Sequence, residues 1–112
     1  MSEKKKIKGI FIDSTNRTIK EIEFVPELQS YYDQLGCSLI DCVSYDEQHD
    51  VIVDDEGLLK EPKTFFKIDS YDGFIAGNGI IVGVDEDGSW ISHNLEKVRV
   101  GFTKLKENEK DN

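Results

Sequence analysis

The chain has 112 residues, about the size of one ordinary domain, and 38% of them are hydrophobic, which is enough for a single core. Its formal net charge of −9 at pH 7 repels nucleic acid and anionic membranes and attracts basic protein surfaces. No apolar run approaches the roughly 20 residues that span a bilayer, and the two cysteines are few for a secreted chain. We therefore expect a cytoplasmic protein that does not bind membranes or nucleic acid directly.

A hairpin of two strands is predicted at the start of the chain. Residues 7–12 are apolar and β-branched, and residues 18–24 place Ile22 and Phe24 on one face with acidic side chains on the other. The polar residues 13–16 between them have a composition typical of a turn.

A helix is predicted next, over residues 26–35. Pro26 suits its first position and Gly36 suits its end. The apolar side chains recur at i, i+3, i+4 and i+7, so we expect one core-facing stripe: Leu28, Tyr31, Tyr32 and Leu35.

The middle of the chain is predicted to contain two strands joined by a polar turn. Residues 37–45 form the first strand, residues 46–50 the turn, and residues 51–53 a short apolar strand. After a second turn at residues 54–57, we expect Leu58 and Leu59 to return to the core. Residues 62–73 have no clear period, and we expect a short helix or turn packed on the sheet.

The last third of the chain is predicted to complete an antiparallel sheet. Residues 74–84 contain a buried strand interrupted by glycines, and the Asp-Gly turn at residues 85–88 leads into a returning strand over residues 89–92. Alternating Val98, Val100 and Phe102 close the sheet.

The predicted fold class is therefore α+β, with a mostly antiparallel sheet of six or seven strands and one main helix over residues 26–35. We expect one acidic domain over residues 1–103 and a disordered tail over residues 104–112, which has almost no apolar side chains.

No catalytic, cofactor or metal site is expected. Cys37 and Cys42 have a spacing outside the usual zinc pattern, and His49 and His93 are far apart in the sequence. The glycines of residues 77–83 miss the dinucleotide-binding spacing and precede a strand instead of a helix, so we interpret them as sheet bends. The sequence contains none of the local signatures of a catalytic nucleophile.

The charge is unevenly distributed. The first eight residues carry a net +3, whereas residues 9–103 carry −12, and Asp41–Glu61 holds eight acidic residues against Lys60 alone. We expect a protein partner with a basic surface to bind the acidic residues of the predicted turns, unless these only keep the protein soluble. These candidate partner-binding residues are Asp46, Glu47, Asp50, Asp54, Asp55, Glu56, Asp85, Glu86 and Asp87.

Three segments together resemble a family of small proteins of unknown function from phages, plasmids and related mobile elements. They are GIFIDSTNRTIKEIEF near the start, HDVIVDDEGLLK in the middle, and IAGNGIIVGVDEDGSW late in the chain. The D-x-E-G-L-L and I-x-G-x-x-I-I-V-G motifs carry the resemblance, which covers residues 7–92, while residues 61–72 depart from the family pattern. The resemblance implies a setting in mobile DNA and the cytoplasm of a bacterial host.

Two functional hypotheses follow. The first is a non-enzymatic accessory protein that binds a host protein through its acidic face, in its specific form by inhibiting a nucleic-acid-processing defence system through nucleic-acid mimicry. The alternative is a protein that binds or sequesters a small ligand such as a nucleotide signal. Its candidate residues are Gly77, Asn78, Gly79, Lys63, Lys67 and Arg99. An exposed edge strand could also support a homodimer.

Overall fold

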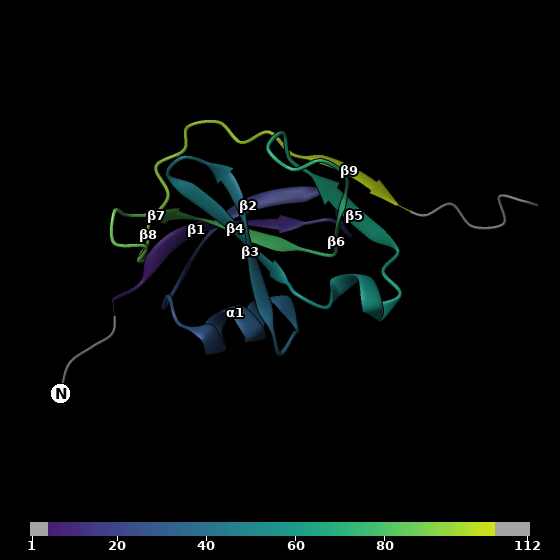
Figure 1. Cartoon of the computed structure of the whole chain (residues 1–112), viewed down its shortest axis with the longest axis horizontal. Helices are drawn as coiled ribbons and strands as arrows, with labels where there is room; N and C mark the ends of the chain where they lie inside the picture. Colours follow the sequence, from purple (N-terminus) through teal and green to yellow (C-terminus); the bar gives the residue numbers. More distant parts are fainter. Residues whose placement is uncertain (1–4, 105–112) are drawn as a thin grey trace, which may run out of the picture.

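Residues 5–104 are described by a computed structural model, in which the chain forms three layers (Figure 1). The middle layer is a six-stranded antiparallel sheet, with α1 (Leu28–Leu35) on one face and a three-stranded sheet on the other. The predicted α+β class is confirmed. The division of the strands between two sheets was not predicted.

The central sheet has the strand order β2-β1-β7-β4-β3, and β8 extends it by pairing with β7. Its strands are β1 (Ile7–Asp13), β2 (Thr18–Phe24), β3 (Ile40–Asp46), β4 (His49–Asp54), β7 (Gly79–Val84) and β8 (Trp90–Ile91). β7 lies in the middle, and residues 79–83 are all buried because both faces of the sheet are covered. The predicted hairpin of residues 7–24 is confirmed, and its two strands pair with Ile7 opposite Phe24 and Asp13 opposite Thr18.

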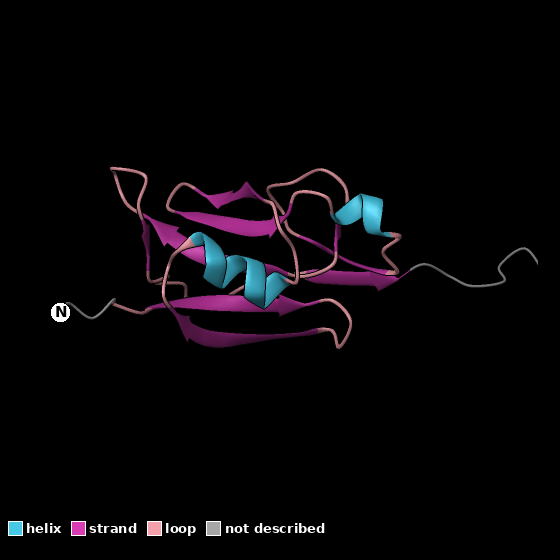
Figure 2. Ribbon diagram, turned by 90° about the horizontal axis from the view of Figure 1, so that it is seen from below, coloured by secondary structure: helices cyan, strands magenta, loops and turns pink. Residues whose placement is uncertain are grey.

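The helix begins two residues later than predicted, because Glu27 keeps an extended backbone and caps it. Gly36 ends it in the left-handed conformation, with φ 66°, as its position predicts. Figure 2 shows α1 lying across one face of the central sheet. Leu28, predicted to belong to the core-facing stripe, is 49% exposed.

Tyr31 is the residue through which α1 enters the core. Its ring is fully buried and meets Phe24 and Trp90 edge to face, with centroid separations of 5.2 and 4.8 Å. Within residues 5–104 its hydroxyl has no hydrogen-bond partner, and burial raises its pKa. Ile52 and Ile80 of the central sheet belong to the same cluster.

The opposite face of the central sheet packs against the second sheet, whose order is β6-β5-β9. These strands are β5 (Thr64–Lys67), β6 (Ile75–Ala76) and β9 (Gly101–Lys104). Phe66 is fully buried in the cluster between the two sheets, together with Ile12 and Val51. The predicted helix or turn over residues 62–73 is therefore wrong at residues 64–67. These residues are extended because β6 and β9 both pair with them.

Several predicted boundaries also shift. β3 begins at Ile40 instead of residue 37, and β4 begins at His49, so the predicted turn of residues 46–50 is shorter. Val98 and Val100 pack against the core from an irregular segment, and only β9 continues as a strand, in the second sheet. Of the predicted tail, Lys104 ends β9 and residues 105–112 lie outside the described residues.

The prediction that Leu58 and Leu59 return to the core is wrong. Both lie in η1 (Gly57–Lys60), a 3₁₀-helix, and their exposed fractions are 72% and 79%. Asp54 fixes the backbone and the last residue of this turn through hydrogen bonds, which leaves the two leucines on the outside.

Candidate functional site

Two acidic turns lie side by side at one end of the central sheet. The β3–β4 turn contains Glu47 and Gln48, and the β7–β8 turn spans residues 85–88. They are adjacent because β4 pairs with β7, and the Val84 N–H donates a 2.8 Å hydrogen bond to the Gln48 carbonyl. We call residues 46–48 and 85–88 the paired acidic turns.

Two carboxylates of the paired acidic turns shape the turns themselves. Asp46 accepts hydrogen bonds of 2.8 Å from the Gln48 N–H and from His49 Nδ1. Asp85 accepts bonds of 2.9 Å from the backbone N–H groups of Asp87 and Ser89. Burial raises the pKa of Asp46, but the hydrogen bonds from Gln48 and His49 outweigh it, and the net pKa is lowered. Both residues are therefore structural as well as acidic.

The remaining three carboxylates of these turns face solvent. Glu47, Glu86 and Asp87 are exposed, and within residues 5–104 none of their carboxylates forms an ion pair or a hydrogen bond. Glu47 and Glu86 line the same open hollow, of about 460 Å³, whose lining also includes His49 and Asn94. The result is an uncompensated negative surface built from two segments that are distant in the sequence.

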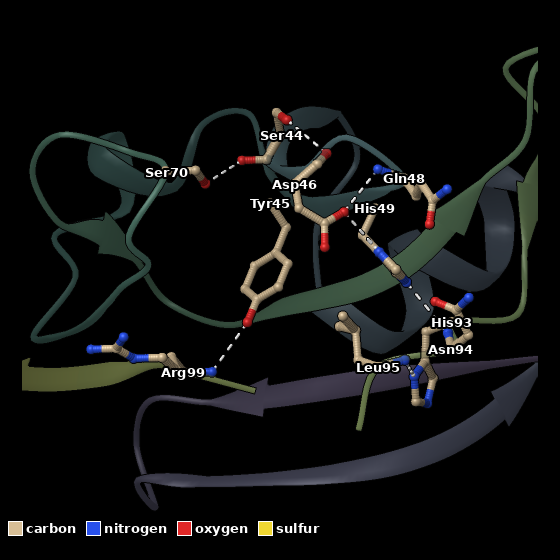
Figure 3. Close-up of polar contacts among 10 residues, drawn as sticks. All are labelled: Ser44, Tyr45, Asp46, Gln48, His49, Ser70, His93, Asn94, Leu95 and Arg99. Atoms are coloured by element: carbon tan, nitrogen blue, oxygen red, sulfur yellow. Dashed lines mark hydrogen bonds and ion pairs between the residues drawn. The ribbon is translucent and has the colours of Figure 1, made fainter. Parts of the chain in front are cut away.

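Buried His49 joins the β3–β4 turn to the irregular segment of residues 92–100 (Figure 3). Its Nε2 accepts a 3.3 Å hydrogen bond from the Asn94 N–H, so in the neutral ring Nδ1 carries the proton that it donates to Asp46. Both ring nitrogens are thus already engaged. Tyr45, whose hydroxyl accepts from the Arg99 N–H at 3.1 Å, holds the same segment further along.

His93 has the complementary arrangement. Its Nδ1 accepts a 3.1 Å bond from the Leu95 N–H, which leaves Nε2 to donate to the Glu21 carboxylate at 2.9 Å. The His93 N–H also donates to the Lys8 carbonyl. Neither histidine has a ring nitrogen free to remove a proton from a substrate, and both fasten residues 92–100 to the central sheet. Sequence reasoning missed this role because the contacts that join the segment to the sheet, His49 with Asn94 and His93 with Glu21, link residues 45 and 72 positions apart.

The second group of predicted acidic residues lies at the other end of β4. Asp54 ends that strand and Asp55 and Glu56 follow it; at about 3.3 Å per residue, Asp54 is roughly 17 Å from His49. Asp54 accepts a 2.9 Å bond from the Glu56 N–H and a 2.8 Å bond from Lys60 Nζ. Asp50 belongs to neither group, since it is half-buried beside Cys42 on the helix side of the sheet, and burial raises its pKa. The nine predicted residues thus form two clusters and one outlier.

A partly apolar hollow borders this second cluster, and we call it the η1 hollow. Its floor includes Val43 and Val53 of the central sheet and Ile75 of β6. Its wall is formed by four exposed apolar or aromatic side chains: Leu58, Leu59, Tyr71 and Phe74. Asp41, Asp54 and Asp55 also line it, so it combines apolar and acidic groups. Sequence reasoning missed this hollow because the leucines were placed in the core.

The candidate ligand-binding residues come together only in part. The Gly77 N–H donates to the Thr64 carbonyl at 3.0 Å, and the Asn78 side-chain oxygen accepts from the Ser14 N–H at 2.9 Å. Gly79 lies within β7, where its backbone pairs with both β1 and β4.

Two cations of that set, Lys67 and Arg99, lie elsewhere. Lys67 and Arg99 line a separate hollow, where Lys67 Nζ donates to the Tyr71 carbonyl at 3.1 Å and Arg99 pairs with Asp69 at 3.6 Å. Exposed Lys63 immediately precedes β5, and its neighbour Thr64 accepts the hydrogen bond from the Gly77 N–H, so its backbone lies beside the glycine segment.

Within residues 5–104, no three histidine, cysteine or acidic side chains are placed to hold a metal ion. Cys37 and Cys42 are both free thiols, and burial, followed by nearby carboxylates, raises the pKa of each. No helix in the described part of the chain has the length and apolar character needed to cross a membrane.

Comparison with known proteins yields one match. A family model described as a domain of unknown function (DUF3846) matches residues 7–105. No curated protein and no solved structure matches the chain.

Proposed function

Because the chain belongs to the family described as a domain of unknown function (DUF3846), we propose its function from its surface and its setting. It is a non-enzymatic accessory protein of a phage or other mobile element, which acts in the cytoplasm of a bacterial host. It binds a host protein with a basic surface, and the paired acidic turns are its principal contact.

The observation that supports this proposal is the adjacency of the two turns. Glu47, Glu86 and Asp87 come from separate strand connections, yet the hydrogen bond between Val84 and Gln48 holds those connections together. Because no cation within residues 5–104 neutralises these three carboxylates, their field extends into solvent. Such a field accelerates association with a basic surface and selects against acidic partners.

The specific form of the proposal is inhibition of a nucleic-acid-processing defence enzyme. Such an enzyme binds phosphates through clustered lysine and arginine side chains, and its affinity for nucleic acid depends strongly on salt. Carboxylates held at one end of the central sheet compete with nucleic-acid phosphates for the same lysine and arginine side chains. The bound protein therefore displaces nucleic acid from the groove.

The test compares two charge-reversed variants of equal net charge. Glu47→Lys/Glu86→Lys changes the paired acidic turns, whereas Glu23→Lys/Asp33→Lys changes exposed acids on β2 and α1. A host protein captured by the wild type should bind the first variant at least about tenfold more weakly, which corresponds to about 1.4 kcal/mol. The second variant should stay within about threefold. Equal weakening by both variants would show that only the total charge matters, and the proposal would fail.

Further measurements separate the alternatives. Binding should weaken between 50 mM and 500 mM salt, because the Debye length falls to a few Å, and duplex DNA should compete for the captured protein. If the small-ligand alternative holds, a nucleotide at 100 times its Kd adds about 2.7 kcal/mol of stability in a thermal-shift screen. Sedimentation analysis tests the predicted homodimer, for which the edge strands β2 and β3 of the central sheet are available.

A further inference from the structure

The η1 hollow presents apolar side chains that the fold does not need for its core. Leu58 and Leu59 are 72% and 79% exposed, and Phe74 is 53% exposed. Isolated exposed apolar residues are common, but a group of them around one hollow is typical of an interaction site. This group lies over a floor that is continuous with the buried cluster between the two sheets.

Polar contacts hold the leucines in this exposed position. Asp54 accepts from the Glu56 N–H and from Lys60 Nζ, and Lys60 Nζ also approaches the Gly36 carbonyl at 3.4 Å. At the start of the turn, Gly57 lies next to β6, and a Cβ there would be in ordinary contact with the Ala76 carbonyl oxygen, at 3.4 Å. An inward turn of the η1 side chains would therefore break the contacts of Asp54 with Glu56 and Lys60.

The size and charge of the hollow define its occupant. Its volume of about 180 Å³ is below the roughly 300–1,000 Å³ of ordinary small-molecule pockets, which favours one large side chain of a protein over a metabolite. Of the carboxylates that line it, Asp54 is neutralised by Lys60, whereas Asp55 is exposed and unpaired within residues 5–104. Asp41, exposed on β3, adds a further negative charge.

We propose that the η1 hollow binds a partner-protein segment in which one large apolar side chain is flanked by lysine or arginine. The apolar side chain packs among Leu58, Leu59 and Phe74, while the flanking cations pair with Asp41 and Asp55. A second copy of this chain fits poorly, because each copy has a net charge of −9 and would bring acidic rims together. This inference rests on the proposed protein-binding function but assigns it a second, chemically distinct contact.

The test uses three synthetic nonapeptides and nuclear magnetic resonance titration of the full chain. The first peptide has a central phenylalanine flanked by lysines and arginines, the second replaces the phenylalanine with serine, and the third flanks phenylalanine with aspartates. The first should shift the amide signals of Asp55, Leu58, Leu59 and Phe74. The second should bind at least tenfold more weakly, and the third should not bind. Equal binding of the first two, or binding of the third, overturns the proposal.

Matched variants locate the contact. Leu59→Ser should weaken binding of the first peptide at least tenfold, whereas Leu28→Ser, at an exposed leucine of α1, should leave it unchanged. Leu59 is 79% exposed, so Leu59→Ser should keep the wild-type melting temperature, whereas Leu28→Ser should lower it slightly because about half of Leu28 is buried. Equal effects of the two substitutions would overturn the proposal.

The two proposals can fail separately. In one outcome, the first peptide binds as expected while Glu47→Lys/Glu86→Lys leaves capture of the host protein unchanged. This result would support peptide binding by the η1 hollow and reject the partner-binding role of the paired acidic turns. If that variant loses the host protein but the first peptide does not bind the wild type, the hollow inference falls and the proposed function stands.

Discussion

Gly79 of β7 leaves no room for a Cβ between the central sheet and Phe66 of the second sheet, and its replacement by alanine tests that packing. A Cβ at this position would lie 2.8 Å from Phe66 Cζ and 2.9 Å from Val51 Cγ1. Both neighbouring side chains are fully buried, so neither can move into solvent. The φ angle of Gly79 lies outside the left-handed region, so alanine meets no backbone strain there and its effect is steric.

The magnitude follows from the overlap. Carbon atoms in a protein core are normally about 3.5–4.0 Å apart, so Phe66 must shift by roughly 1 Å. Overpacking of this kind costs about 1–3 kcal/mol, and the reduced entropy of the unfolded chain with alanine offsets about 0.4–1 kcal/mol. We expect Gly79→Ala to lower the free energy of unfolding by about 1–2 kcal/mol. For a domain of this size, that lowers the melting temperature by about 4–16 °C.

Urea denaturation and calorimetry measure the effect, and Gly101→Ala is the matched control. Gly101 is exposed on β9, and a Cβ there would meet no atom within 4 Å. Phe66→Leu should cost less in the Gly79→Ala protein than in the wild type, because the shorter side chain relieves the overlap. If the Gly79→Ala variant is as stable as the Gly101→Ala variant, Gly79 is not as tightly packed against Phe66 and Val51 as the structure indicates. A clear loss of stability without any ligand would support a packing role for Gly79.

Three further predictions concern single polar or sulfur groups. Tyr31→Phe should raise the free energy of unfolding by about 1 kcal/mol, because it removes a buried hydroxyl that has no partner among the described residues. In the Asp46→Asn variant, the free energy of unfolding should decrease less steeply as the pH is lowered. The folded-state pKa of Asp46 is lowered, so its contribution is present above the unfolded pKa of about 3.9 and is lost as pH falls through the folded pKa. Cys42 should react slowly with iodoacetamide near pH 7, because burial, then Asp50 and Asp41, raise its pKa.

Controls accompany each of these measurements. Tyr45→Phe should be destabilising, opposite in sign to Tyr31→Phe, because the Tyr45 hydroxyl accepts a hydrogen bond from the Arg99 N–H. Urea titrations from pH 7 to pH 2 compare wild type with Asp46→Asn, and unchanged pH dependence would contradict the assigned role. Asp50→Asn should speed alkylation of Cys42, since it removes a nearby negative charge, and an unchanged rate would count against that cause.

Local patterns were sufficient where a segment's own residues decide its conformation. The alternation of residues 18–24 predicted β2 at its observed bounds, and Gly36 predicted the left-handed end of α1. Residues 64–67 show where local patterns fail. Their strand depends on pairing with β6 and with β9, which lies more than 30 residues downstream. Adjacent Phe65 and Phe66 have no period that distinguishes this strand from a short helix.

The same distinction, between features set by neighbouring residues and features set by tertiary contacts, applies to the candidate site. Sequence alone determined the acidic character, the turns that contain most of the carboxylates, and the class of the fold, because charge and short-range periodicity are properties of neighbouring residues. Only the tertiary structure decided that Glu47 and Glu86 share one surface, since this requires the pairing of β4 with β7, whose paired residues lie 26 to 34 positions apart in the sequence. It also decided that Leu58 and Leu59 face solvent. Their apolar character predicts burial, but the contacts of Asp54 with Glu56 and Lys60 hold the turn that exposes them.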